Sequence, residues 1–213
     1  MLLLVAAAML LVAAWIFRGY FEKTSVIRIG VLHSLTGTMA MSEAPLVDAL
    51  RLAVEETNQS GGINGAQIEM VVADCRSDAA VCAEEAERLI TQEKVAALFG
   101  CWTSICRKAV RPVAEKYDRL LFYPVQYEGL EQSPNIVYTG AVPNQQLVPM
   151  LNWAMQQFGK RAYLVGSDYV FPRTANGIAR KLLQAQDGTA VAERYVPLGG
   201  QDMDAVAQDI ATR

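Results

Sequence analysis

Histidine is almost absent from this 213-residue sequence, in which His33 is the only one. A catalytic histidine paired with a cysteine nucleophile would have to be His33, with Cys101 or Cys106 as the thiol. No third group at a recognisable spacing orients such a pair. We therefore expect a protein that is not an enzyme and assign no catalytic residue.

Clustered basic residues are also missing. The chain has 19 Lys and Arg against 22 Asp and Glu, a formal net charge of -3 and a pI near 5.3. The basic residues are spread along the chain and form no stripe of the kind that binds nucleic acid. No G-x-G-x-x-G follows the first predicted strand, and G-K-[ST] does not occur. These absences exclude nucleic acid as a partner and disfavour a phosphate ligand.

The few cysteines are not arranged as CxxC pairs. They stand at Cys75, Cys82, Cys101 and Cys106. This spacing disfavours a zinc or thioredoxin-type site, so neither a metal nor a cofactor is expected. In an exported protein we expect one or two disulfides, with Cys75 joined to Cys101, because each follows a predicted strand at the same end of the sheet. Buried free thiols are the alternative that remains open.

An uncharged, strongly apolar run covers residues 2–17. It enters a membrane either as a signal peptide or as an uncleaved tether through residues 2–21. The basic residue that usually precedes a signal peptide core is absent and the cleavage pattern is poor, which favours the anchor. We expect the rest of the chain to be periplasmic or otherwise extracytoplasmic, although Arg18, Lys23 and Arg28 point the opposite way by the positive-inside rule.

Short β-type runs alternate with longer segments of helical period after residue 26, which is the signature of an α/β fold with parallel sheets flanked by helices. The predicted strands are 27–32, 68–73, 95–99, 120–123, 162–165 and 191–196. One buried helix face is predicted from the spacing of Leu46, Ala49, Leu50, Ala53, Val54 and Thr57. Helix N-caps are predicted at Asp78, at Thr103 or Ser104, and at Asn144.

Two lobes are expected, with a crossover in residues 133–144, where two prolines bracket an extended stretch. The predicted domains are 1–23 for the apolar segment, 24–143 for the first α/β lobe and 144–213 for the start of the second. Only two predicted strands fall in the second lobe, and two strands cannot bury enough surface to stand alone. We therefore expect the second lobe to be incomplete in this chain.

Candidate ligand contacts lie beyond the carboxyl ends of the strands, where open parallel sheets bind ligands. Ser104 begins a helix, so its hydroxyl and the N–H groups of that turn can donate to a carbonyl oxygen or a carboxylate. The alternative is that Ser104 is a plain N-cap. Tyr123 ends a strand and offers a ring for stacking, or packs at the rim. Tyr169 follows a second-lobe strand and would face the first lobe. Weaker candidates are Trp102, Thr103 and Gln126.

The order of motifs in residues 27–213 resembles the type 1 periplasmic binding proteins. The resemblance is to the branch that holds the urea ABC-transporter substrate-binding proteins and the amide-binding regulators. The motifs are GVLHSLTGTMA at 30–40, FGCWTS at 99–104, LFYPVQYEG at 121–129, SPN at 133–135, PNQQ at 143–146 and GSDYVFPR at 166–173. The resemblance implies two α/β lobes joined by three crossovers, which close around a ligand and deliver it to a membrane permease.

Site roles are also implied by the resemblance. Ser104 and Tyr123 match the first-lobe polar and stacking residues of amide binders, and Tyr169 matches a second-lobe contact. Val125 and Phe171 stand where the amide-binding regulators carry hydroxyl groups, and both resemble the urea branch. The expected function is the substrate-binding component of an ABC-type importer for urea or short-chain amides. The alternative is an extracytoplasmic urea- or amide-sensing domain of a membrane signalling protein.

Overall fold

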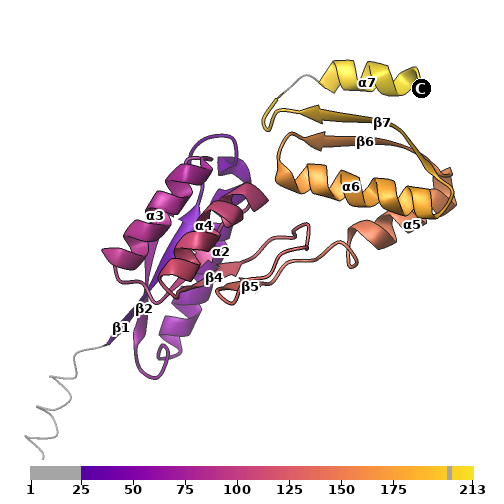
Figure 1. Cartoon of the computed structure of the whole chain (residues 1–213). Coiled ribbons are helices and arrows are strands. Elements are labelled where there is room, and N and C mark those ends of the chain that lie inside the picture. The colour runs from indigo at the N-terminus through magenta and orange to yellow at the C-terminus, as the bar shows by residue number, and fades with distance from the viewer. Residues whose placement is uncertain (1–24, 201–202) are drawn as a thin grey trace, which may run out of the picture.

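The computed structural model describes residues 25–200 and 203–213. The predicted apolar segment at 1–23, with its tether through residues 2–21, lies outside the described residues. Among the helices that are described, none is both long and apolar enough to cross a membrane. Figure 1 shows two α/β units connected by extended segments of chain.

A parallel five-stranded sheet forms the first lobe, in the order β2-β1-β3-β4-β5. Its strands are β1 (Val26–His33), β2 (Gln67–Asp74), β3 (Ala97–Gly100), β4 (Leu120–Tyr123) and β5 (Ile136–Tyr138), and its helices are α2 (Ala40–Gln59), α3 (Ala79–Thr91) and α4 (Ser104–Lys116). The predicted α/β class and the four strands predicted for this lobe are confirmed. The direction of strand succession changes between β1 and β3, so the loops after these two strands diverge and leave room for a ligand.

Strand β5 is the element of this lobe that the sequence does not predict. The extended stretch at 136–138 was expected to be only part of a crossover, but it pairs with β4 from Leu121 opposite Ile136 to Tyr123 opposite Tyr138. Three residues are too few for an alternating pattern to show. The crossover therefore begins by adding an edge strand to the first sheet.

The main core lies between the first sheet and the helices α3 and α4, which also contact each other. Leu32, Leu98 and Leu121 extend from three adjacent strands into this layer and have no exposed surface. Helix α2 is buried through Glu43, Val47 and Val54. Of the face predicted for it, Ala49 and Ala53 are exposed, since the helix contacts mainly β1 and β2 and is buried along a narrower stripe.

Two of the predicted helix caps are confirmed and one is wrong. The Asp78 carboxylate accepts the N–H groups of Ala80 and Val81 at the start of α3, and the Thr103 hydroxyl accepts that of Cys106 in α4. Helix α5 (Leu147–Phe158) begins after Gln146 and has no side-chain cap, so Asn144 does not cap it. A backbone turn precedes the helix instead, in which the N–H groups of residues 145 and 146 donate to the carbonyl of residue 142, and the helical N–H of residue 148 donates to the carbonyl of residue 143.

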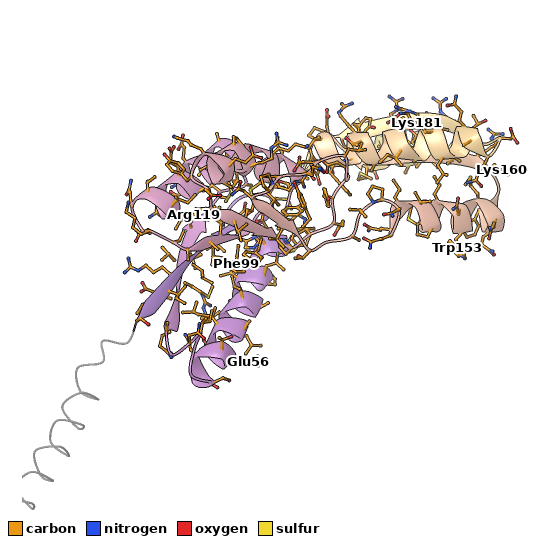
Figure 2. The ribbon with its side chains drawn as sticks, turned by 60° about the horizontal axis from the view of Figure 1, so that its bottom comes forward. Glu56, Phe99, Arg119, Trp153, Lys160 and Lys181 are labelled. Atoms are coloured by element: carbon orange, nitrogen blue, oxygen red, sulfur yellow. A yellow bond between two sulfur atoms is a disulfide. The ribbon has the colours of Figure 1, made fainter. Side chains whose placement is uncertain are left out.

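The second lobe holds a two-stranded parallel sheet, as predicted, made of β6 (Arg161–Ser167) and β7 (Thr189–Val196). Helix α6 (Val170–Ala185) covers one side of this sheet with α5 against it, while α7 (Met203–Ala211) lies on the other side (Figure 1). Five buried side chains form its small core: Leu151, Met155, Leu164, Ala179 and Leu183. Trp153 on α5 is 56 % exposed and points away from α6 (Figure 2).

All four cysteines are in disulfides, Cys75 with Cys82 and Cys101 with Cys106. The predicted pair of Cys75 with Cys101 is therefore wrong, and so is the alternative of free thiols. Strand β1 lies between β2 and β3 in the sheet, so the loops after β2 and β3 start about two strand spacings, or roughly 9–10 Å, apart. That separation exceeds the reach of a disulfide, and each loop cysteine pairs with one in the helix that follows it.

Candidate functional site

The two lobes approach each other at the carboxyl ends of their strands. Helix α4 contacts α6, and a Cβ on Gly199 would lie 2.6 Å from the Thr38 side chain of the first lobe. A cavity of about 30 Å³ is lined by Ser34 and Thr103 on one side and by Leu198, after β7, on the other. This region between the lobes, where the loops after β1, β3, β4, β6 and β7 meet, is the candidate ligand site.

Ser104 opens helix α4 and is bonded to two buried charged residues. Its hydroxyl donates to Glu128 Oε2 across 2.6 Å and accepts from Arg107 Nη1 across 3.0 Å. The side chain is almost fully buried, with 2 % of the residue exposed. Its single proton is thus engaged by Glu128, and donation to a ligand carbonyl, the role proposed from the sequence, requires Glu128 to release it.

Arg107 and Glu128 are site residues that the sequence interpretation missed. Arg107 is three residues after Ser104 on α4, and this spacing alone would have placed both on one helix face. Its guanidinium bonds Glu128 Oε1 at 3.1 Å and Glu131 Oε1 at 2.9 Å. Lys108 adds a bond of 2.6 Å to Glu131 and lies 3.4 Å from Glu128. Two cations and two carboxylates therefore neutralise one another beneath the site.

Tyr123 has no exposed surface. The Arg107 guanidinium lies 4.7 Å from its ring centre, and its hydroxyl donates to the Trp102 carbonyl across 2.7 Å. Burial, partly offset by the positive charge of Arg107, raises the pKa of Tyr123 to about 12. These contacts give Tyr123 a positioning role for the loop after β3. Stacking on a ligand, which the sequence suggests, would require Arg107 to uncover the ring.

The remaining first-lobe candidates differ in accessibility. Trp102 is half-buried against the main core, Thr103 is buried as the cap of α4, and Gln126 is exposed after β4. The first N–H groups of a helix have no partner within the helix, so residues 104 and 105 point hydrogen-bond donors out of α4. The start of α4 is therefore the best-placed donor group of the first lobe for a carbonyl oxygen.

Tyr169 is the candidate residue that the second lobe contributes to the ligand site. It stands at the cap position of α6 and is half-buried. Burial, and after it the negative charge of Glu128, raise the pKa of Tyr169. Phe171 lines a second cavity of about 170 Å³ together with Tyr127 and Glu128. Of the three principal candidates from the sequence, Ser104 bonds Glu128, and Tyr169 is two residues before Phe171, which lines a cavity with Glu128.

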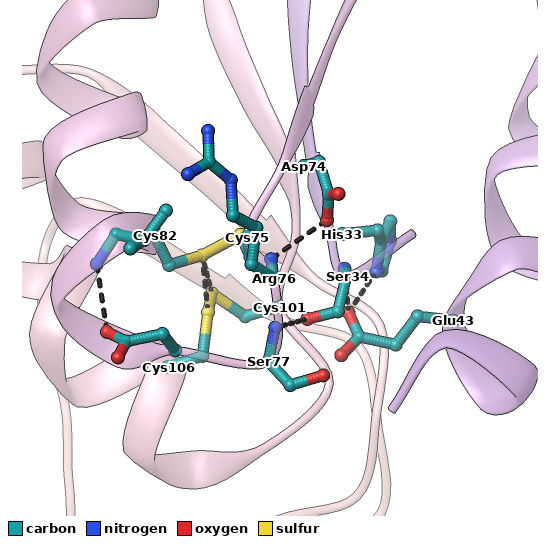
Figure 3. The surroundings of a disulfide bond; sticks show 12 residues. His33, Ser34, Glu43, Asp74, Cys75, Arg76, Ser77, Cys82, Cys101 and Cys106 are labelled. Carbon is teal, nitrogen blue, oxygen red and sulfur yellow. Dashed lines mark hydrogen bonds and ion pairs between the residues drawn. A yellow bond between two sulfur atoms is a disulfide. The ribbon is translucent and has the colours of Figure 1, made fainter. Parts of the chain in front are cut away.

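The loop after β1 is fixed by two carboxylates. Glu43 accepts the N–H of Ser34 at 3.0 Å and bonds His33 Nδ1 at 2.9 Å (Figure 3). Asp74 accepts the N–H of Leu35 and the N–H and hydroxyl of Thr36. Burial opposes ionisation of Asp74, but these bonds and one from the Arg76 N–H outweigh it and lower its pKa.

The histidine and cysteine pair considered for an enzyme is not assembled. His33 is bonded to Glu43, and both candidate thiols, Cys101 and Cys106, are joined in a disulfide (Figure 3). A thiolate nucleophile requires a free thiol. The arrangement therefore gives no support to cysteine-based amide hydrolysis.

A larger cavity of about 750 Å³ runs along α6, between that helix, the start of β7 and Leu130. It lies at the amino end of β7, whereas ligand sites of open α/β sheets lie beyond the carboxyl ends. It also receives none of the candidate residues. The candidate site therefore lies at the loops between the lobes and not in this larger cavity.

The fold defines a two-lobed α/β protein whose candidate ligand site lies between the lobes. A family model described as a periplasmic binding protein domain matches residues 27–213. The chain belongs to this family.

Curated relatives match part of the chain. Leu/Ile/Val-binding protein homolog 7 of Brucella suis is 33 % identical over 102 residues, which cover 48 % of this chain and 25 % of the relative. An amino acid binding protein of Pseudomonas aeruginosa is 33 % identical over 90 residues, 42 % of this chain and 23 % of the relative. The matched part thus spans about a quarter of these relatives.

Solved structures match nearly the whole described chain. LivJ of Streptococcus pneumoniae, a branched-chain amino acid transporter substrate binding protein in complex with isoleucine, is 27 % identical with a TM-score of 0.78, over 89 % of this chain and 55 % of that one. A solute binding protein of an ABC transporter from Rhodopseudomonas palustris, in complex with 3,4-dihydroxy benzoic acid, is 23 % identical with a TM-score of 0.79, over 88 % and 52 %. The second match shows the fold alone, and this chain spans about half the length of both.

Proposed function

We propose that this chain supplies the first lobe and the start of the second lobe of an extracytoplasmic substrate-binding protein for an ABC-type importer. We further propose that its ligand is a small neutral amide, with urea favoured. The protein captures the ligand between its lobes and hands it to a membrane permease, without making or breaking a covalent bond. Membership of the periplasmic binding protein family supports the first part.

The pairing of charges at the site is the observation that carries the second part. Arg107, Lys108, Glu128 and Glu131 pair with one another, so each of these charges has an opposite charge within 3.1 Å. A charged ligand needs a counter-charge that is free to receive it, since a buried unpaired charge is costly. A neutral molecule needs only hydrogen bonds. The site therefore suits an amide better than an amino acid zwitterion.

Two cavities border the proposed site. One of about 30 Å³ is lined by Thr103 at the start of α4, and one of about 170 Å³ is lined by Glu128 and Phe171. Both are smaller than ordinary ligand pockets, which measure about 300–1,000 Å³, and this supports a small ligand. Of the two positions that resemble the urea branch, Phe171 lines the cavity that Glu128 also lines, and Val125 is buried in the main core.

In the proposed complex the N–H groups at the start of α4 donate to the ligand carbonyl, with the Ser104 hydroxyl beside them. Glu128 accepts from the ligand N–H₂ groups, and Tyr169 closes from the second lobe. Trp102, Thr103 and Gln126 border the site, and Tyr123 holds the loop in place. The amide oxygen thus meets donors and the amide nitrogens meet an acceptor.

Calorimetric titration of the natural protein that contains this chain, with urea, acetamide and leucine in turn, tests the proposal. We expect heat of binding with urea, less with acetamide and none with leucine. Binding of leucine alone would contradict the amide assignment.

Tyr169→Ala is the matching variant, and we expect it to weaken urea binding roughly tenfold, which is about 1.4 kcal/mol. Trp153→Ala is its control, because this aromatic residue of the second lobe is exposed on α5 and points away from α6 (Figure 2). Equal affinities of the two variants would remove Tyr169 from the site.

A further inference from the structure

The two disulfides lie against each other in one buried cluster of four sulfur atoms (Figure 3). Sγ of Cys82 is 2.8 Å from Sγ of Cys106 and 3.9 Å from Sγ of Cys101. The sulfur atoms of Cys75, Cys82 and Cys106 all lie within 4.8 Å of one another. Two disulfides that served only to staple separate loops would not need to meet.

The spacing of these sulfur atoms is close to that of a tetrahedral thiolate site. With Zn–S bonds of about 2.3 Å, the sulfur atoms around a tetrahedral zinc are about 3.8 Å apart. Sγ of Cys82 lies 2.8 and 3.9 Å from the two sulfur atoms of the other disulfide, which is on either side of this value. The fold thus brings three sulfur atoms, those of Cys75, Cys82 and Cys106, within 4.8 Å of one another. The fourth, that of Cys101, is joined to Cys106 and lies 3.9 Å from Cys82.

The backbone around the cluster favours thiolates. Cys82 is the fourth residue of α3 and Cys106 the third residue of α4, so both lie in the first turn of a helix. The partial positive charge of a helix N-terminus lowers the pKa of a nearby thiol and stabilises negative charge. Two helix N-termini therefore face the position at which a tetrathiolate site would concentrate charge.

We propose that Cys75, Cys82, Cys101 and Cys106 form a redox-gated metal site, which binds one thiophilic divalent cation of the Zn²⁺ type when both disulfides are reduced. Two molecules of a dithiol supply the four electrons and four protons that open the two S–S bonds, and each dithiol is itself oxidised to a disulfide. Binding of one Zn²⁺ then releases the four thiol protons. In the oxidised chain the sulfur atoms are bonded in pairs and hold no metal.

This site would also act on the ligand loop. Cys101 and Cys106 flank residues 102–105, which contain Trp102, Thr103 and Ser104, so a disulfide or a bound metal would hold the start of α4 at the same place. The proposed metal site requires only the four cysteines and does not depend on which small molecule binds between the lobes. Its failure and that of the proposed function are therefore distinguishable.

Cobalt titration under anaerobic conditions tests the site. The chain is reduced with dithiothreitol, freed of the reductant and titrated with Co²⁺, whose tetrahedral thiolate complexes have intense charge-transfer and visible d–d bands. We expect these bands to saturate at one Co²⁺ per chain, to disappear when Zn²⁺ is added, and to be absent from the oxidised chain. Absence of the bands from the reduced chain would overturn the proposal.

Variants separate the site from unspecific thiol binding. Cys82→Ser removes the sulfur that is close to both members of the other disulfide, and we expect it to abolish the bands. Ser77→Ala, in the same loop after β2, is the matched control and should keep them. Bands that are equally strong in Cys82→Ser would also refute the site.

Folding of the reduced chain is followed in parallel by far-ultraviolet circular dichroism. Where reduction or Cys82→Ser lowers the helical signal, Zn²⁺ should restore it in the reduced parent chain and not in the variant, because metal binding and folding are coupled. Protection from alkylation gives an independent measure, with all four thiols of the parent expected to be shielded by Zn²⁺. Unchanged alkylation with and without Zn²⁺ contradicts the proposal.

Discussion

Ser104 donates its hydroxyl proton to Glu128 across 2.6 Å, and this bond ties the start of α4 to the loop after β4. Both residues are buried, and Arg107 bonds both of them. A network in which every member has a partner is rigid, whereas removal of one member leaves the others unsatisfied in a region of low dielectric. The first-lobe half of the proposed site is therefore built before any ligand arrives.

Replacement of Arg107 should destabilise the chain strongly. Arg107 has no exposed surface and neutralises two carboxylates. Removing one partner of a buried ion pair costs about 3–5 kcal/mol, so we expect Arg107→Met to lower the melting temperature by roughly 10 °C. Differential scanning calorimetry measures the shift.

Arg51→Met is the matched control for that experiment. Arg51 is paired with Asp48 at 3.0 Å, but its side chain is 54 % exposed. Exposed pairs contribute little, so we expect a change of less than about 1 kcal/mol. Similar shifts for the two variants would show that burial of Arg107 does not matter.

The stability of the folded chain should fall at acidic pH, because the Glu131 carboxylate becomes protonated there. Burial alone would raise its pKa, but hydrogen bonds from Arg107, Lys108 and Tyr138 outweigh burial and lower the pKa from the ordinary 4.5 to about 2. Because the folded-state pKa is the lower one, the stabilisation is complete above the ordinary pKa. It is lost as the pH falls from about 4.5 towards about 2.

Melting curves of the parent chain and Glu131→Gln between about pH 7 and pH 2 test this dependence. We expect the variant to be less stable at neutral pH and to lose less stability on acidification. Glu55→Gln, on the exposed side of α2, should follow the parent curve. A Glu131→Gln curve parallel to that of the parent would contradict the assignment.

The sequence predicts those parts of this molecule that depend on local pattern. The apolar runs give six strands, and single polar residues such as Asp78 and Thr103 identify two helix starts. The disulfides depend on strand order, because β1 separates β2 from β3, and no local pattern encodes that order. The bond between Arg107 and Glu128 joins residues 21 positions apart and is likewise a product of the sheet.

Gly100 should tolerate no side chain. It has a φ of +148°, and a Cβ there would lie 1.9 Å from the carbonyl oxygen of Leu32 on the neighbouring strand β1. Gly100→Ala would force β3 away from β1 just before the ligand loop. We expect a loss of about 3 kcal/mol or more, measured as a fall in melting temperature or in soluble yield.

Gly177→Ala gives the opposite expectation. Gly177 lies inside α6, where the nearest atom to an added Cβ is 3.8 Å away on the Arg180 side chain. Alanine in a helix interior is more stable than glycine by about 0.5–1 kcal/mol, so this variant should melt at a higher temperature. Destabilisation by Gly177→Ala as large as that by Gly100→Ala would refute the steric account.

Tyr123→Phe distinguishes a positioning role of Tyr123 from stacking on the ligand. The variant keeps the ring but loses the 2.7 Å bond to the Trp102 carbonyl, which leaves a polar group unsatisfied at a cost of about 1–3 kcal/mol. If Tyr123 positions the loop, the variant has a lower melting temperature and weaker urea affinity. If the ring stacks on the ligand, the affinity is unchanged in Tyr123→Phe and falls only in Tyr123→Leu. We expect the first result, because the ring is fully buried and covered by Arg107.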